Sequence, residues 1–318
     1  MAIIVDAAVQ LVQLILVLAI APLLTGYVRK VKAHLLRRRG PPLLQPYRDL
    51  LKQIRKEVVL AQNASWVFRV APYVIFATTL IAAALVPTFA TGLMFSPAAD
   101  LIAIVALLGS ARFALALAGL DIGTSFGGIG ASREMMIASL AEPAMLMIVF
   151  TLSLLAGSTQ LSSVSTFMHG PDVGLRVSLA MALVALVMVA LAENARIPVD
   201  NPATHLELTM IHEAMILEYS GRHLAVIEAA ASLKLLLYMS LIACVFLPWG
   251  LASTGDGLMA FAIGAGSYVA KLALGGFLLA AFETVTAKMR VFRVSDFLGV
   301  ALMLGLLAAL LLFVSHST

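Results

Sequence analysis

The sequence is poor in charged residues and in cysteine. Of its 318 residues, 62% are hydrophobic and only 12% are charged. A water-soluble core cannot use that much apolar surface, so the composition predicts a polytopic membrane protein. The one cysteine, Cys244, excludes an internal disulfide and a cysteine cluster that would hold an iron–sulfur centre or a structural zinc.

Compact motifs of soluble enzymes are also missing. The six histidines form no HExxH pair, and the chain has no P-loop and no G-x-S-x-G. The glycines Gly127, Gly128 and Gly130 lie between two apolar segments with no strand before them, which argues against a dinucleotide site. The net charge of +4 reflects basic loops and does not indicate nucleic acid. The N-terminus lacks a basic n-region and a cleavage site, so residues 3–26 are expected to form a retained membrane helix.

Apolar runs long enough to cross about 30 Å of hydrocarbon recur about eight times. They predict one all-α integral membrane domain over residues 1–318. The spans are expected near 3–27, 68–91, 98–120, 133–157, 174–193, 223–250, 257–284 and 294–315.

Lysine and arginine lie mostly on one side of this arrangement. The odd-numbered loops carry nearly all of them, from Arg29 to Arg69 in the first loop and on to Arg293 in the last, whereas the opposite loops carry only Arg176. Basic loops face the cytoplasm, so we expect both termini on the external side.

The first loop has a helical pattern of its own after Pro41 and Pro42. Apolar residues recur at helical spacing and charged residues take the other face, which predicts an amphipathic helix at the cytoplasmic interface. The simpler interpretation is an anchor on the lipid surface. The alternative is a wall or lid for a site on the cytoplasmic side.

Acidic residues gather on the cytoplasmic half of the chain. They are Asp121, Glu134, Glu142, Glu193, Asp200, Glu207, Glu213, Glu218, Glu228 and Glu283. Each alone would be explained by a structural ion pair between helices. For the set we favour a proton path, because desolvation and mutual repulsion favour protonated acids near neutral pH. Arg112, Lys234 and Lys271 lie deeper, without a charged residue one turn away, so each must find a partner on another helix or face water.

The most acidic stretch runs from Glu193 to Gly221. Asn201 and Pro202 can begin a helix that Ser220 and Gly221 can end, so a cytoplasmic or re-entrant helix is expected over about 202–218. His205 and His212 are seven residues apart and share a face of that helix. Two histidines without a compact motif indicate titrating or hydrogen-bonded residues, with a metal site as the alternative.

Three blocks resemble the membrane subunit of respiratory complex I that adjoins the quinone cavity. They are Arg39-Gly40-Pro41 with Leu43-Leu44-Gln45-Pro46, Asp49, Lys52 and Glu57; Arg133 with Glu142; and Glu193-Asn194-x-Arg196-x-Pro198-x-Asp200 with Glu207-Leu208 and Glu218-Tyr219-Ser220-Gly221. The resemblance covers essentially the whole chain.

The departures from that subunit point to one branch of the family. Compared with the complex I subunit, the first loop is shorter and the segment from Leu208 to Glu218 is longer. Ala203 and His205 replace two acids of that subunit, and Glu134 follows Arg133 where the quinone enzymes usually have a small residue. In this form the chain resembles the membrane subunit of group-4 NiFe-hydrogenases, of the hydrogenase-4 component C and formate hydrogenlyase type. The shortened first loop counts against quinone binding.

The resemblance implies a membrane anchor and coupling subunit in a bacterial or archaeal inner membrane. Its partners would be hydrogenase-type large and small subunits, an iron–sulfur subunit, antiporter-like membrane subunits and lipid. The NiFe centre and the iron–sulfur clusters would belong to those partners, and no cofactor or metal to this chain. Some related complexes have a large subunit that lacks the metal-binding cysteines. The sequence of this chain does not distinguish them, because those cysteines would lie on a different polypeptide. A quinone-binding subunit of a complex I-like enzyme and a free-standing proton or ion transporter are the alternatives.

Two groups of residues follow as candidates. For proton transfer and coupling, they are Glu142, Glu193, Asp200, Glu207, Glu213, Glu218, Glu228, Glu283, Arg133, Glu134, Lys234, His205 and His212. For docking of the peripheral arm, they are Arg38, Arg39, Gln45, Arg48, Asp49, Lys52, Arg196 and Tyr219.

Overall fold

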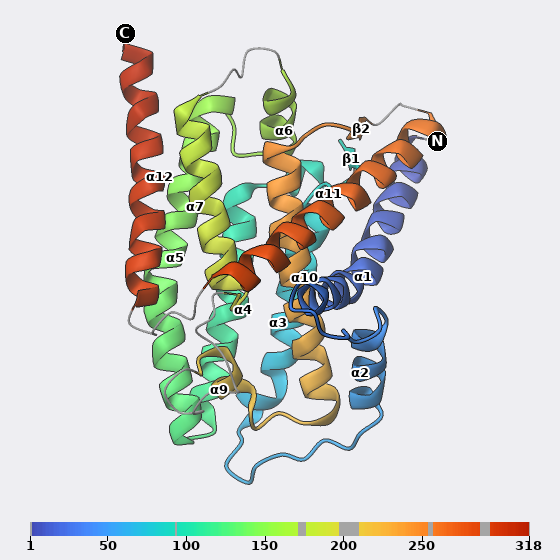
Figure 1. Cartoon of the computed structure of the whole chain (residues 1–318), viewed down its shortest axis with the longest axis vertical. Helices are drawn as coiled ribbons and strands as arrows, with labels where there is room; N and C mark the ends of the chain where they lie inside the picture. The colour runs from blue at the N-terminus through green and yellow to red at the C-terminus, as the bar shows by residue number, and fades with distance from the viewer. Residues whose placement is uncertain are drawn as a thin grey trace.

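Long apolar helices make up most of the computed structural model (Figure 1), which describes residues 2–92, 94–170, 176–196, 210–253, 257–286 and 293–317. Within these described residues, seven helices are long and apolar enough to cross a membrane: α1 (Ala2–Leu35), α3 (Trp66–Leu85), α4 (Leu101–Asp121), α5 (Ser125–Ala156), α10 (Gly221–Phe246), α11 (Leu258–Val285) and α12 (Arg293–Ser317). A shorter apolar helix, α7 (Val177–Glu193), completes the set. Each of these eight helices overlaps one of the predicted spans, and the all-α membrane class is confirmed.

Short elements connect the long helices. They are α2 (Gln45–Ile54), the 3-10 helix η1 (Ser96–Ala98), α6 (Leu161–His169), α9 (His212–Ile216) and a two-stranded parallel pair, β1 (Ala90–Thr91) with β2 (Ala252–Ser253). The helix α2 confirms the amphipathic helix expected in the first loop. The sequence pattern did not predict α6 or the strand pair.

The expected start of the fourth span was wrong. The helix α5 begins at Ser125 rather than near residue 133, so Gly127, Gly128 and Gly130 lie in its first turns. The Thr124 side chain accepts a hydrogen bond from Gly127 N and caps the helix. A Cβ on Gly127 would lie 2.2 Å from the carbonyl oxygen of Gly119. Gly127 and Gly130 therefore serve close packing, whereas a Cβ on Gly128 would meet nothing within 4 Å.

The expected helix over 202–218 was wrong in its described part. Residues 202–209 lie outside the described residues, Met210 and Ile211 are not helical, and α9 covers only His212–Ile216. Ser220 and Gly221 do not end that helix but begin α10, with Ser220 extended at φ −137°. Gly221 has φ +56°, which a glycine adopts readily.

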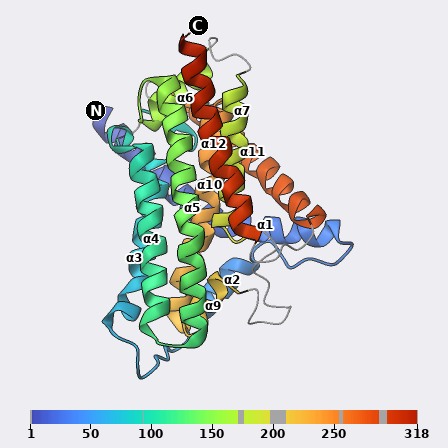
Figure 2. The ribbon, with the colours of Figure 1, turned by 90° about the vertical axis from the view of Figure 1, so that its left-hand side faces the viewer.

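The helix α10 occupies the centre of the bundle. It packs against α1, α2, α3 and α7, while α5 packs against α4, α7 and α12 (Figure 2). Both ends of the chain lie at one end of the molecule, with α6 and the strand pair, and α9 lies near the other end (Figure 1). An even number of crossings requires this arrangement of the termini.

Candidate functional site: a buried ionic cluster

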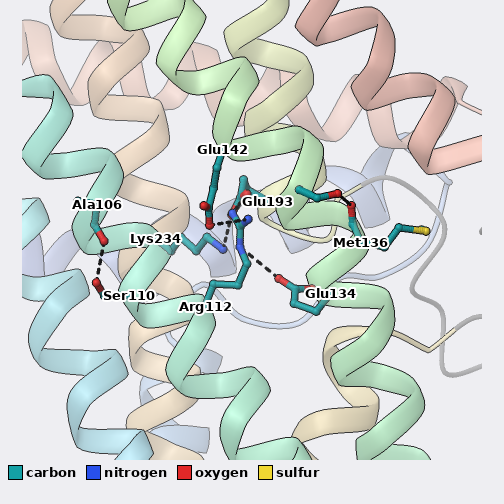
Figure 3. Close-up of polar contacts among 9 residues, drawn as sticks. Ala106, Ser110, Arg112, Glu134, Met136, Glu142, Glu193 and Lys234 are labelled. Atoms are coloured by element: carbon teal, nitrogen blue, oxygen red, sulfur yellow. Dashed lines mark hydrogen bonds and ion pairs between the residues drawn. The ribbon is translucent and has the colours of Figure 1, made fainter.

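Arg112 of α4 is the centre of a buried ionic cluster formed by four helices (Figure 3). Only 5% of Arg112 is exposed. Its Nε lies 3.5 Å from Glu134 Oε1, its Nη1 lies 3.5 Å from Glu142 Oε1, and its Nη2 pairs with Glu193 Oε1. The planar guanidinium, with several donors pointing in different directions, can contact three carboxylates at once.

The helix register explains why the two acids of α5 meet one arginine. Glu134 and Glu142 are eight residues apart, which is about 12 Å along a helix, and the Arg112 guanidinium lies between them. Gly109 gives Glu142 its space, because a Cβ there would lie 3.2 Å from Glu142 Oε1. The geometry therefore depends on a small residue one turn before Arg112.

Lys234 of α10 supplies the second cation of the cluster. Its Nζ lies 2.8 Å from Glu193 Oε2, and the Glu193 side chain is only 1% exposed. As expected from the sequence, Arg112 and Lys234 thus find partners on other helices. Three carboxylates and two cations leave a formal charge of −1 if all are ionised (2 − 3). The acids are therefore mostly compensated by cations rather than left to repel one another.

A cavity of about 330 Å³ lies on one side of the cluster. Arg112, Glu134, Glu193 and Lys234 form its inner wall. Its other charged or titratable lining residues are Arg29, Asp49, Arg196, His212, Glu213 and Glu228. Since Asp49 belongs to α2, the amphipathic helix forms a wall of this cavity.

Glu142 faces a different space from the other two acids. Its side chain is 44% exposed and lines a groove of about 810 Å³ beside α3, α4 and α5 that is otherwise mostly apolar. A void of about 10 Å³ lies between Glu142, Glu193, Arg112 and Tyr238, which is close to the room one water needs. Arg112 therefore separates a polar cavity from a lateral groove.

Glu283 belongs to a second ion-pair group at the ends of α1, α7 and α11. Its carboxylate lies 2.6 Å from Lys32 Nζ and 3.4 Å from Arg196 Nη1. Burial lowers the pKa of Arg196, while the Glu283 carboxylate acts in the opposite direction. No ion pair among the described residues joins this group to the Arg112 cluster. Arg196 nevertheless lines the same cavity.

Of the remaining proton-path candidates, His212, Glu213 and Glu228 line the cavity. Glu228 accepts a hydrogen bond of 2.9 Å from Gln53 of α2, and Arg133 donates one of 2.8 Å to the Met210 carbonyl. Glu213 and Glu218 are exposed. Asp200, His205 and Glu207 lie outside the described residues. In the part of the chain that the structure describes, no group of three potential ligands could hold a metal ion.

Most docking candidates lie on the surface of the first loop. Arg38, Arg39, Arg48 and Lys52 are exposed, and Gln45 donates to Asp49 over 2.8 Å. The expectation for Tyr219 was wrong, because it is only 4% exposed and therefore unavailable to a partner.

Tyr219 is held inside the protein by α3. Its ring stacks on Phe68 at 3.8 Å, and its hydroxyl donates to the Phe68 carbonyl over 2.9 Å. Burial raises the pKa of Tyr219, with the Asp121 carboxylate adding to the effect.

Gln53 and Tyr238 are site residues that the sequence reasoning missed. Gln53 lies on the polar face of the amphipathic helix, and Tyr238 lies four residues after Lys234. Helical spacing from a buried charge would have indicated Tyr238. No sequence signal linked Gln53 to Glu228, because that contact joins distant parts of the chain.

The chain belongs to the family described as NADH dehydrogenase, whose model matches residues 8–314. It is 35% identical to formate hydrogenlyase subunit 4 of Escherichia coli (strain K12) over 283 residues, covering 88% of this chain and 90% of that one. It is 36% identical to hydrogenase-4 component C of the same organism over 243 residues, covering 76% of each chain. It is also 30% identical to NADH-ubiquinone oxidoreductase chain 1 of Triticum aestivum over 242 residues, covering 72% and 73%.

A solved structure shares the fold. A chain of the membrane-bound sulfane sulfur reductase, an archaeal respiratory membrane complex, superposes with a TM-score of 0.77 and 18% identity, covering 98% of this chain and 99% of that one. The similar proteins thus include hydrogenase, formate hydrogenlyase and complex I components, in agreement with the resemblance drawn from the loop motifs.

Proposed function

We propose that this chain is the membrane anchor and coupling subunit of a multisubunit redox complex that translocates protons. It would join a peripheral NiFe-hydrogenase-type arm to antiporter-like membrane subunits. The names of the two relatives with 35% and 36% identity support the hydrogenase branch. The basic first loop, with exposed Arg38, Arg39, Arg48 and Lys52, offers a surface for the arm.

The observation that carries the proposal is the position of Arg112 between two spaces. On one side lies the polar cavity, where Glu193 and Lys234 are paired over 2.8 Å. On the other side, Glu142 lines the lateral groove. A charge change in the cavity would shift how Arg112 divides its contacts among the three acids, because buried charges interact strongly. Glu142 would then bind or release a proton toward a neighbouring subunit.

The redox groups would belong to the partners. The large subunit of the arm would hold the NiFe centre, and smaller subunits would hold the iron–sulfur clusters. This chain offers one cysteine, Cys244, which is 2% exposed. Its own residues would therefore bind the arm and move protons.

The test compares variants of the intact complex in membrane vesicles. Glu142→Gln and Glu193→Gln each keep side-chain shape and remove a carboxylate from the cluster. Asp296→Asn is the matched control, since Asp296 is exposed in the first turn of α12. Turnover of the arm and acidification of the vesicle lumen are measured together. We expect the two cluster variants to lose proton transport at least about tenfold per turnover, as expected for removal of a proton-transfer group.

Two outcomes would contradict the proposal. The first outcome is proton transport in both cluster variants that equals transport in the control. It would show that Arg112 and its partners take no part in proton transfer. The second outcome is turnover that requires added quinone and is abolished by Glu193→Gln, a change in the cavity lining. That result would favour a quinone-binding subunit instead. Metal analysis of the purified complex identifies the partners, because nickel together with iron indicates the hydrogenase arm. If the chain transports ions without any partner, it is a free-standing transporter.

A further inference from the structure

A groove separate from the ionic cluster lies on the outside of α1 and α11. Its volume is about 450 Å³, and the residues that line it are Tyr27, Lys30, Val31, His34, Leu35, Leu43 and Phe277. Six come from α1 or the first loop and one from α11. The helices α1 and α11 contact each other, and their ends project together from one side of the bundle (Figure 2).

The floor of the groove is apolar and continuous with lipid-facing surface. Tyr27 packs closely on α11, because a Cβ on Gly276 would lie 3.0 Å from the Tyr27 ring. Beside it Phe277 is 45% exposed and Leu278 is 58% exposed. Leucine and phenylalanine exposed on a membrane-crossing helix face acyl chains, so hydrocarbon can extend from the groove into the bilayer.

The rim of the groove is basic. Lys30 and His34 follow directly on the apolar run of α1, one turn apart on the same face. His34 Nδ1 is 2.8 Å from the Lys30 carbonyl, which fixes the ring and leaves Nε2 for another partner. The lining includes no acidic residue. The nearest acid on α11, Glu283, is paired with Lys32 and Arg196, so Lys30 has no described carboxylate partner in the groove.

On both helices the change from apolar to charged residues lies at this groove. Toward this end of α1 the charges begin at Arg29, and on α11 the apolar run that follows Lys271 ends at Glu283. Phe277 lies six residues before Glu283, about 9 Å deeper along the helix axis. An occupant must therefore be negative at the Lys30 end and apolar at the Phe277 end.

We propose that this groove binds an anionic phospholipid, with the phosphate against Lys30 and His34 and the first part of an acyl chain over Tyr27 and Phe277. Basic side chains at the interface attract anionic lipid, and the apolar floor excludes a purely soluble anion from most of the groove. The bound lipid would fill the space between α1, the first loop and α11. The site does not depend on the coupling function proposed above.

The experiment uses the intact complex purified in mild detergent and analysed by native mass spectrometry for retained phospholipid. The variant is Lys30→Gln with His34→Gln. The matched control is Arg55→Gln with Lys56→Gln, which removes two exposed basic residues of the same loop that do not line the groove. We expect the first pair to reduce retained anionic phospholipid about fivefold or more, and the control to retain it at the wild-type level.

A second arm separates lipid from free phosphate. Complex stripped of lipid is incorporated into vesicles of phosphatidylcholine alone or with phosphatidylglycerol, with or without inorganic phosphate. Phosphatidylglycerol should raise the Tm of the wild-type complex and leave the Lys30→Gln, His34→Gln complex unchanged. Equal retention by variant and wild type would overturn the proposal. An equal rise in Tm from inorganic phosphate alone would identify a soluble anion as the ligand instead.

Discussion

At the scale of the residue, the cluster shows which contacts a sequence reveals. Arg112 and Lys234 were predicted to need partners because an unpaired charge in a membrane bundle is costly. The sequence could not tell which acids those partners are, because this depends on how the helices pack. Glu134, Glu142 and Glu193 lie 22 to 81 residues from Arg112 along the chain. The prediction that Tyr219 docks the peripheral arm was wrong for the same reason, because its neighbour Phe68 is 151 residues away along the chain.

The Tyr219 hydroxyl allows a test of the contact between the fifth loop and α3. Tyr219→Phe keeps the ring stacked on Phe68 and removes one buried hydrogen bond. We expect a loss of about 1 kcal/mol in the free energy of unfolding. Tyr219→Ala should lose about 3 kcal/mol, because it also removes the buried ring. Thermal unfolding in detergent measures both, and equal stability of wild type and Tyr219→Phe would refute the hydrogen bond.

The same tyrosine predicts a pH dependence. Burial raises the pKa of Tyr219 in the folded state, whereas in the unfolded chain the value is about 10. The folded state therefore holds the proton more tightly, so this contribution is fully present below about pH 10 and is lost as pH rises further. The fall in Tm above pH 10 should be smaller in Tyr219→Phe. Identical slopes in the two proteins would show that Tyr219 does not contribute.

At the scale of the element, the lipid hydrocarbon constrains the long helices, which the sequence can therefore predict, but it does not constrain the short elements between them. Eight apolar runs predicted eight helices because a spanning backbone must satisfy its own hydrogen bonds. No such constraint acts on the connections. The strand pair Ala90–Thr91 with Ala252–Ser253 joins residues 162 apart, and α9 is limited to five residues. Neither element has a local sequence signal long enough to predict it.

The junction between the first and fifth loops depends on one glycine. Gly221 has φ +56°, and a Cβ there would lie 2.6 Å from the Glu57 carbonyl and 2.8 Å from the Lys56 carbonyl. Beside it, Ser220 Oγ accepts from Val59 N over 2.9 Å and donates to the Val59 carbonyl over 3.0 Å. The start of α10 and the end of the first loop are therefore held together.

Gly221→Ala should break this junction. We expect a loss of about 1–3 kcal/mol in the free energy of unfolding, from the positive φ and the backbone contacts. The matched control is Gly128→Ala in α5, where a Cβ meets nothing within 4 Å and alanine favours the helix by up to about 1 kcal/mol. Chemical unfolding of the two variants checks the contrast, and equal effects would mean that the Gly221 contact is unimportant.

At the scale of the whole molecule, charge asymmetry and crossing number are linked. Both termini lie at one end of the bundle (Figure 1), as an even number of crossings would require. The first loop, with its basic residues, and the cavity lie toward the other half. The sequence could therefore predict which loops share a side, because lysine and arginine are retained in the cytoplasm. It could not predict the cavity itself, since α1, α3, α4, α5, α7 and α10 must pack with α2 and α9 before its lining residues meet.

This arrangement predicts opposite chemical accessibility of two loops in the native membrane. The chain has one cysteine, Cys244, which is 2% exposed, so the wild type should react slowly with a membrane-impermeant maleimide and serves as the background. Arg55→Cys introduces a thiol in the exposed first loop, and Gln160→Cys introduces one in the exposed turn before α6. Because basic loops face the cytoplasm, intact cells should label Gln160→Cys, and inverted vesicles should label Arg55→Cys. Reversed labelling would invert the topology and place the polar cavity on the external side, where a cytoplasmic redox arm could not dock beside it.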